Sequence, residues 1–165
     1  MSAREYIEHL QLIAHEEGGY FREIYQSEDT MLLSDREGGA RPLMNTIYYM
    51  LTHESPVGYL HLNKSDITHF FHAGSPLTYH LVWPDGRHET RIMGPDVAGG
   101  HLLQMTVPGG VWKATQLVDG EFGLISEAVA PGFDYRDWQI ADEELVRREF
   151  PQHAAALADV IHKSR

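Results

Sequence analysis

The feature that most constrains this chain is a long succession of short, strand-like segments that begins at Tyr20. Runs of Tyr, Ile, Val, Phe and Thr alternate there with Gly, Pro, Asp and Asn, which is typical of β-strands joined by tight turns. Strands at such regular spacing favour a closed barrel or a double-sheet jelly roll, whose interior can hold a ligand. The predicted strands cover residues 19–26, 45–51, 58–62, 67–73, 77–83, 89–93, 102–107, 112–117 and 123–129.

Both ends of the chain show helical patterns instead. Apolar residues recur at helical spacing between about residues 3 and 15, and Gly18 and Gly19 then end the pattern. Near the other end, Asp142 is a suitable N-cap and Pro151 breaks the helix, beyond which Leu157, Val160 and Ile161 share one face. Because no linker or repeat divides the sequence, we predict a single all-β domain over residues 1–165, with a barrel core at about 19–135 and short helices at both ends.

Charge and cysteine content exclude several classes of protein. The chain has 13 basic and 24 acidic side chains, a formal charge of −11, and its basic residues are scattered, which disfavours nucleic-acid binding. No apolar run is long enough to cross a bilayer and the first residues do not resemble a secretion signal, so we expect no membrane partner and a cytoplasmic location. Without cysteine, any chemistry must use His, Asp, Glu, Lys, Arg or Tyr.

Several blocks of sequence, in order, resemble a known family. GYLH at residues 58–61, followed by Asp66 and Gly74, resembles the first motif of the cupin superfamily, and VPGGVWK at 107–113 resembles the second. With HEEGGYFRE (15–23), LNKSD (62–66), HFFH (69–72) and EAVAPGFDY (127–135), nearly the whole chain is similar to the cupin group DUF985, or cupin type 5. The resemblance implies a cupin jelly-roll β-barrel, usually a homodimer, in a family without a settled activity. A dimer would also cover exposed sheet edges.

The resemblance also indicates where a metal would bind. Metal-binding cupins supply two His and one Glu from the first motif and one His from the second, and these positions here hold His61, Asn63, Ile67 and Lys113. The Lys113 ammonium would put a positive charge where the metal's charge would lie, so we favour a site without a metal cofactor. A divalent transition metal held by a substitute set, His61, His69 and His80, stays open as the alternative.

Strand alternation places the candidate catalytic residues. Tyr59 and His61 fall on one face of a strand, and the registry of the metal motif directs that face and His69 into the barrel. Asp66, in the turn between the two strands, would orient an imidazole, which makes His61 a candidate general base. Lys113 would then stabilise developing charge, and Tyr59 would be the acid. The alternatives are a structural role for His69 and a turn-capping role for Asp66.

A second set of polar residues is predicted to bind the ligand. Arg22 and Lys113 would clamp a carboxylate or phosphate, which makes a small anion the predicted ligand. Tyr48 and Tyr79 fall at strand positions from which a phenol could donate to a ligand oxygen. Gln104, Glu127 and Glu17 lie in or near the family-like blocks and would complete the hydrogen-bonding set.

Three functions follow from these residues. The first is a metal-independent isomerase or epimerase that acts on a small, oxygen-rich anion, because sugar-nucleotide epimerases of the cupin superfamily use His, Asp, Lys and Tyr to move a proton beside a carbonyl. The second is a module that binds a metabolite without transforming it. The third is a metal-dependent cupin enzyme with His61 and His69 as ligands. Residue types alone do not choose among them.

Overall fold

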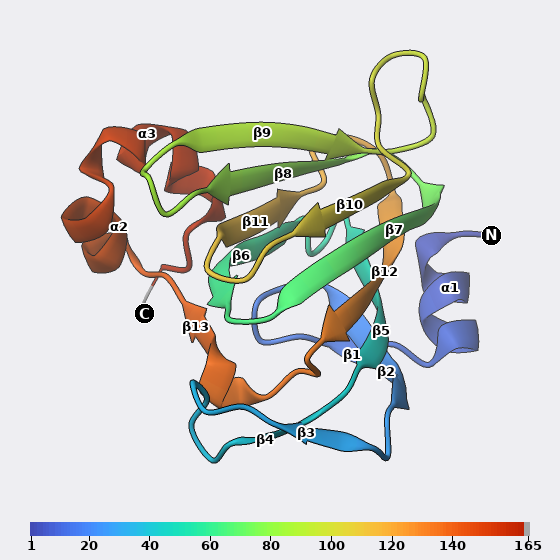
Figure 1. The fold of residues 1–165 in the computed structure, drawn as a ribbon. Helices are drawn as coiled ribbons and strands as arrows, with labels where there is room; N and C mark the ends of the chain where they lie inside the picture. Colours follow the sequence, from blue (N-terminus) through green and yellow to red (C-terminus); the bar gives the residue numbers. More distant parts are fainter. Residues whose placement is uncertain (164–165) are drawn as a thin grey trace.

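The computed structural model describes residues 1–163 and shows two antiparallel sheets packed face to face as a jelly roll (Figure 1). The six-stranded sheet has the order β1-β2-β5-β12-β7-β10, the five-stranded sheet has the order β13-β6-β11-β8-β9, and β3 pairs with β4 in a separate hairpin. The strands are β1 (Ile13–Ala14), β2 (Tyr20–Gln26), β3 (Thr30–Leu32), β4 (Ala40–Pro42), β5 (Asn45–Thr52), β6 (Val57–Asn63), β7 (Asp66–Gly74), β8 (Leu77–Val82), β9 (His88–Met93), β10 (Gln104–Val107), β11 (Trp112–Gln116), β12 (Phe122–Ala130) and β13 (Trp138–Ile140). The helices are α1 (Ala3–Leu10), α2 (Glu143–Glu149) and α3 (Ala154–Leu157), with 3-10 turns η1 (Tyr135–Asp137), η2 (Pro151–His153) and η3 (Ala158–Val160). The predicted all-β fold with short terminal helices is confirmed.

The predicted strands correspond to β2 and β5 to β12, whereas β1, β3, β4 and β13 were not predicted. The predicted helix over residues 3–15 is too long. It ends at Leu10 because Gln11 adopts a left-handed φ of 54° and donates its backbone N–H to Glu8 O at 3.3 Å. The two residues of β1 then pair with Phe21 and Tyr20 in β2, so their apolar side chains belong to a strand and not to the helix.

The space between the sheets has an apolar end and a polar end. The apolar core consists of Tyr49, Leu51, Leu77, Tyr79, Leu81, Met93, Met105, Val107, Val111, Leu117 and Ile125. On the inward face of β12, the apolar Ile125 is followed two residues later by the polar Glu127. On β7, the buried Ile67 and His69 alternate with more exposed residues. The polar end lies toward the β3–β4 hairpin and η1, at the bottom of Figure 1. An interior site can therefore form only at this end.

The terminal segments cover the outer faces of the two sheets. Helix α1 packs on the six-stranded sheet through a cluster that includes Ala3, Met50 and Phe122. The C-terminal segment packs on the five-stranded sheet through a cluster of Leu60, Val82, Ala114, Ala141, Leu145, Val146, Phe150, Leu157, Val160 and Ile161. Asp142 is the N-cap of α2, as predicted, and accepts a hydrogen bond from Leu145 N at 2.8 Å.

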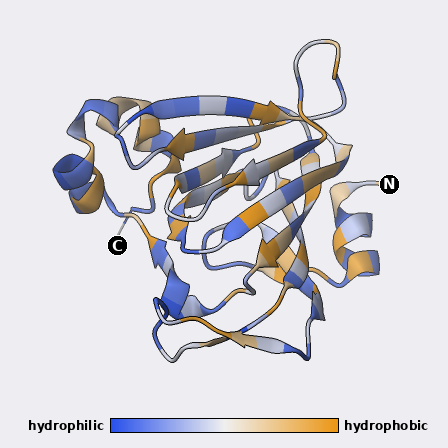
Figure 2. Ribbon diagram, in the orientation of Figure 1, coloured by the Kyte–Doolittle hydropathy of each residue, from blue (hydrophilic) through white to orange (hydrophobic). Residues whose placement is uncertain are grey.

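Much of edge strand β9 is hydrophilic (Figure 2). Within residues 1–163, the helices are all too short or too polar to span a membrane.

Candidate functional site

A cavity of about 290 Å³ opens between the sheets at the polar end of the jelly roll. Its walls come from the loop before β2, from β2, β5, β6, β7 and β12, and from the segment that follows β12. The lining residues are His15, Glu17, Phe21, Glu23, Asn45, Ile47, His61, Asn63, Ile67, Glu127, Val129, Phe133, Tyr135 and Trp138. The cavity thus combines two imidazoles and three carboxylates with a largely apolar and aromatic wall.

Glu17 and His61 form a carboxylate–imidazole pair at this cavity. His61 is 5% exposed, and its Nδ1 lies 2.7 Å from Tyr59 O and 3.3 Å from Glu17 Oε2. Because a carbonyl oxygen only accepts hydrogen bonds, Nδ1 carries the proton and Nε2 has the lone pair. Nε2 has no hydrogen-bond partner among residues 1–163, so it remains available to a molecule in the cavity. Burial lowers the pKa of His61 and keeps the imidazole neutral, although Glu17 opposes this shift.

Local contacts hold Glu17 in place and give His15 the opposite tautomer. The Glu17 carboxylate accepts a hydrogen bond from Trp138 Nε1 at 3.1 Å, which ties the loop before β2 to β13. The backbone N–H of Glu17 donates to His15 Nδ1 at 3.1 Å, so in the neutral imidazole of His15 the proton lies on Nε2. The cavity therefore has one imidazole that can donate and one that can accept.

A buried charge network lies next to the cavity. Lys113 Nζ is 3.1 Å from His69 Nε2 and 3.8 Å from Glu127 Oε1, and both Lys113 and His69 are at most 3% exposed. Because an ammonium only donates, His69 Nε2 accepts and its Nδ1 carries the proton, 3.2 Å from Glu127 Oε1. That Nδ1–H is not aligned well enough for a hydrogen bond. Burial alone would raise the pKa of Glu127, but Lys113 and His69 outweigh it and hold the pKa well below its usual range.

We predict that His69 stays neutral at pH 5, because burial first, and then the Lys113 ammonium, lowers its pKa to about 4. The unfolded chain takes up this proton at an ordinary pKa of about 6.5, so it binds more protons than the folded state between pH 6.5 and pH 4. Folding stability should therefore fall by about 3 kcal/mol across this window as the pH is lowered. ¹⁵N NMR of the imidazole should show protonated Nδ1 and bare Nε2. An imidazolium spectrum at pH 5 would contradict the prediction.

The structure brings five predicted residues together, Glu17, His61, His69, Lys113 and Glu127, and places the others elsewhere. Tyr59 was predicted to share an inward face with His61. A β-bulge prevents this, because His61 pairs with Lys113 and Gly58 pairs with Thr115, which leaves two residues of β6 opposite one residue of β11. The Tyr59 ring therefore lies against His162 at a centroid distance of 5.2 Å, outside the cavity.

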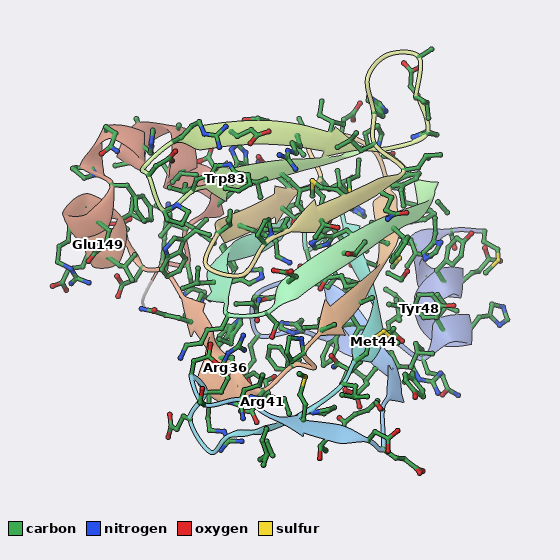
Figure 3. All side chains as sticks on the ribbon, in the orientation of Figure 1. Arg36, Arg41, Met44, Tyr48, Trp83 and Glu149 are labelled. Carbon is green, nitrogen blue, oxygen red and sulfur yellow. The ribbon has the colours of Figure 1, made fainter. Side chains whose placement is uncertain are left out.

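Three predicted ligand-binding residues point outward from the six-stranded sheet. Arg22 is exposed and donates to Leu10 O, the last carbonyl of α1, at 3.2 Å, because its neighbours Phe21 and Glu23 are the ones that line the cavity. Tyr48 packs in the cluster under α1 and lies on that side of the molecule in Figure 3. Gln104 is exposed on edge strand β10. None of the three lines the cavity.

Asp66, His80 and Tyr79 also lie away from the cavity. Asp66 does not orient an imidazole: it is exposed and its carboxylate accepts a hydrogen bond from Gly109 N at 2.8 Å, which matches the turn-capping alternative. His80 Nδ1 is 3.2 Å from His88 Nε2 and is not among the cavity residues. Tyr79 is fully buried in the apolar core, with its ring 5.2 Å from the His69 ring between centroids, and burial raises its pKa. It lies behind His69 and does not line the cavity.

The residues at this site do not fit the metal that many cupins hold. Of the substitute ligand set, His80 is absent from the cavity, and the Nε2 lone pair of His69 accepts from Lys113 Nζ. Within residues 1–163, His61 is the one member of this substitute set with an imidazole nitrogen free for a ligand in the cavity. Throughout residues 1–163, no three His, Asp or Glu side chains converge in a metal-holding arrangement. An ammonium therefore stands in place of the fourth metal ligand.

Sequence reasoning missed His15, Glu23 and the aromatic wall. His15 and Glu17, like Phe21 and Glu23, are spaced two residues apart in the first family-like block, and this spacing was the available signal. Phe133 and Tyr135 lie in the last block, but only the path of the chain after β12 places them over the cavity mouth. No local pattern predicts that path.

A jelly roll of two antiparallel sheets around a cavity lined by His and Glu defines this protein as a cupin. The chain belongs to the DUF985 family of the cupin superfamily, whose model matches residues 4–141. It is 39% identical to the uncharacterised protein YML079W of Saccharomyces cerevisiae, over 95% of this chain and 85% of the yeast protein. The resemblance to DUF985 predicted from the sequence is thus confirmed.

Solved structures agree with this assignment. A hypothetical protein from Leishmania major superposes with a TM-score of 0.91 at 34% identity, and it covers 98% of this chain and 99% of its own. Protein SO0799 from Shewanella oneidensis gives a TM-score of 0.90 at 30% identity, with 99% of each chain covered. Oxalate decarboxylase from Bacillus subtilis matches at a TM-score of 0.56 and 15% identity, over 92% of this chain and 37% of the decarboxylase, and shares the fold alone.

Proposed function

We propose that this protein binds a small molecule in the cavity and moves a proton on it without a metal, with His61 as the general base. The observation that carries the proposal is the buried His61 imidazole, whose unpaired Nε2 lines the cavity while Nδ1 faces Tyr59 O and Glu17. In this arrangement the carboxylate orients the ring and stabilises the imidazolium that forms when Nε2 takes a proton. The role first assigned to Asp66 therefore passes to Glu17.

His15 supports the second half of a proton transfer. Its Nδ1 accepts from the backbone, so its Nε2–H can donate to the ligand while His61 accepts. Two imidazoles in opposite tautomers are what removal and return of a proton at neighbouring atoms requires. An isomerase or epimerase reaction is the simplest chemistry of this kind, as the sequence suggested. The three cavity carboxylates, however, do not favour the anionic substrate predicted from the sequence.

The experiment that tests the proposal is deuterium exchange in D₂O. The protein is incubated with a metabolite extract, and mass spectrometry searches for a compound that gains one non-labile deuterium. We expect one such compound with the wild-type protein, and exchange at least about 10²-fold slower with His61→Asn, because the base is gone. Glu17→Gln should slow exchange as well. His9→Asn, which changes an exposed histidine in α1, should leave exchange unchanged.

The rival function, binding without catalysis, gives a different result. A compound would then co-purify with the protein and show no exchange, and His61→Asn would only weaken its binding. Exchange that survives in His61→Asn would show that another group is the base. Either result would overturn the proposed proton transfer.

The homodimer predicted from the sequence has one supporting feature. Strand β1 pairs only with Tyr20 and Phe21, so the outer edge of β2 beyond Phe21 has no partner strand within residues 1–163. Ile24 and Tyr25 on this stretch are about half exposed, at 49% and 51%. An open strand edge with exposed apolar side chains is a surface that a second copy can cover. The dimer stays a prediction.

A further inference from the structure

The charges around the cavity are unbalanced. Glu17, Glu23 and Glu127 line it, and within residues 1–163 no Lys or Arg is among its lining residues. Lys113 lies next to the cavity, but it is 3% exposed and already contacts His69 and Glu127. The cavity therefore carries a net negative charge near neutral pH, which attracts cations and repels anions.

The aromatic wall adds a second attraction for positive charge. Phe133 and Tyr135 have ring centroids 4.9 Å apart at 81°, and Tyr135 and Trp138 are 5.8 Å apart at 86°. Both pairs are edge-to-face contacts between rings that line the cavity, and the face of each ring is the negative end of its quadrupole. Aromatic rings that line a ligand cavity attract organic ammonium groups through cation–π interaction.

Two of the polar groups left unused in the cavity are acceptors suited to an ammonium group. His61 Nε2 has no partner within residues 1–163 although its residue is 95% buried, since its exposure is 5%. Glu23 uses one carboxylate oxygen to accept from Asn45 Nδ2 at 3.2 Å, and its other oxygen makes no hydrogen bond within the same range. An ammonium group has N–H donors and no acceptor, so it matches this set better than a carboxylate or phosphate does.

We infer that the cavity selects a small organic ammonium ion, whose N–H groups donate to Glu23 and Glu127, while Phe133, Tyr135 and Trp138 contact its positive end by cation–π attraction and its apolar part by packing. The inference rests on the proposed function only in taking this cavity as the ligand site. A volume of about 290 Å³ corresponds to a ligand of roughly ten non-hydrogen atoms, if each takes up about the 30 Å³ of a liquid water. The ligand is therefore of the size of a small aromatic or branched amine.

Three probes of similar size and different charge test the inference: phenethylamine, 2-phenylethanol and phenylacetate. Isothermal titration calorimetry at pH 7 should show phenethylamine binding at least about tenfold more tightly than the alcohol, and phenylacetate binding more weakly than both. Glu23→Gln should bring the affinity for the amine close to that for the alcohol and leave the alcohol unchanged. Glu28→Gln, an exposed glutamate in the turn after β2, should change neither affinity.

Four results would overturn the inference: phenylacetate binds as tightly as the amine, the amine and the alcohol bind equally, Glu23→Gln has no effect, or none of the three probes binds to folded protein. The binding experiment tests the choice of ligand, whereas the deuterium-exchange experiment tests the proposed proton transfer, so the two proposals can fail separately. If the cavity selects the amine but no deuterium exchange depends on His61, the proposed proton transfer is refuted and the inference about the ligand stands. If His61-dependent deuterium exchange is found on an anion that binds in the cavity, the proposed proton transfer stands and the inference about the ligand is refuted.

Discussion

Replacement of Lys113 by methionine is expected to lower the free energy of unfolding by about 3–5 kcal/mol, which is the cost of leaving a buried charge without its partner. Methionine keeps an unbranched apolar side chain that is one heavy atom shorter and removes the ammonium. Glu127, whose side chain is 13% exposed, would then face only His69, and His69 Nε2 would lose its donor. Urea unfolding at pH 7.5 measures the change.

The loss should depend on pH in a defined direction. In the wild-type protein, Lys113 is among the causes that depress the pKa of His69, second to burial. Without the ammonium, the pKa of His69 should rise, because the imidazolium then gains Glu127 as an unshared partner. Protonation of His69 below this new pKa restores part of the lost stability. The difference between Lys113→Met and wild type should therefore be smaller at pH 5 than at pH 7.5.

Two controls separate the network from generic effects. Glu127→Gln in the Lys113→Met background removes the second charge, so the double variant should recover more than about 1 kcal/mol relative to additive losses. Lys64→Met changes an exposed lysine and should stay within about 0.5 kcal/mol of wild type. If Lys113→Met unfolds like Lys64→Met, the buried network does not stabilise the fold.

Strand periodicity predicted the sheets well because each strand has a buried and an exposed face, which the period-two pattern records directly. The same pattern failed at Tyr59, since one extra residue in β6 shifts every assignment before His61. It failed at Arg22 as well. Phe21 and Glu23 lie on one face of β2 and Arg22 on the other, and no cue in the sequence tells which face points inward. The Arg22 guanidinium lies on the outward face and donates a hydrogen bond to Leu10 O at the end of α1.

Lys113 and His69 were both expected inside the barrel, and both are buried there, on facing strands β11 and β7 of the two sheets. The partner of His61 was not predicted. Glu17 lies 44 positions earlier in the chain, in a loop whose position depends on a hydrogen bond from Trp138. Asp66 is closer to His61 in the sequence and also carries a carboxylate, but its carboxylate accepts a hydrogen bond from Gly109 N in the turn. Contacts between distant segments are set by the packed fold, and no local pattern reports them.

The second large effect concerns Asp137, which anchors the segment that carries the aromatic wall. Arg41 is fully buried, and its Nε and Nη2 donate to Oδ2 and Oδ1 of Asp137 at 2.8 and 2.9 Å. Arg36 donates to the same carboxylate at 3.0 Å, and both arginines lie near the β3–β4 hairpin in Figure 3. Asp137→Asn leaves a fully buried guanidinium with only the more distant Asp134 carboxylate, 3.9 Å away, as a charge partner, so we expect a loss of about 3–5 kcal/mol in unfolding free energy.

The pH dependence of this loss follows from the pKa of Asp137, which hydrogen bonds from Arg41 lower most, with help from Arg36 and against burial. A carboxyl group with a depressed folded pKa stabilises the protein fully above its unfolded pKa of about 3.9 and loses that contribution below it. The gap between wild type and Asp137→Asn should thus be constant from pH 5 to pH 8 and narrow below pH 4. Asp35→Asn is the matched control, because Asp35 lies 3.5 Å from Arg36 but is 76% exposed.

Asp137→Asn should also open the cavity wall locally before the whole domain unfolds. Asp137 ends η1, directly between Tyr135 and Trp138, so its ion pairs hold two of the rings that line the cavity. Amide hydrogen exchange over residues 134–140 should become faster in Asp137→Asn, while β8 and β11 in the apolar core keep their protection. Asp35→Asn should exchange like wild type in both regions. Uniformly faster exchange in Asp137→Asn would mean that the ion pairs stabilise the domain as a whole and do not hold the wall in particular.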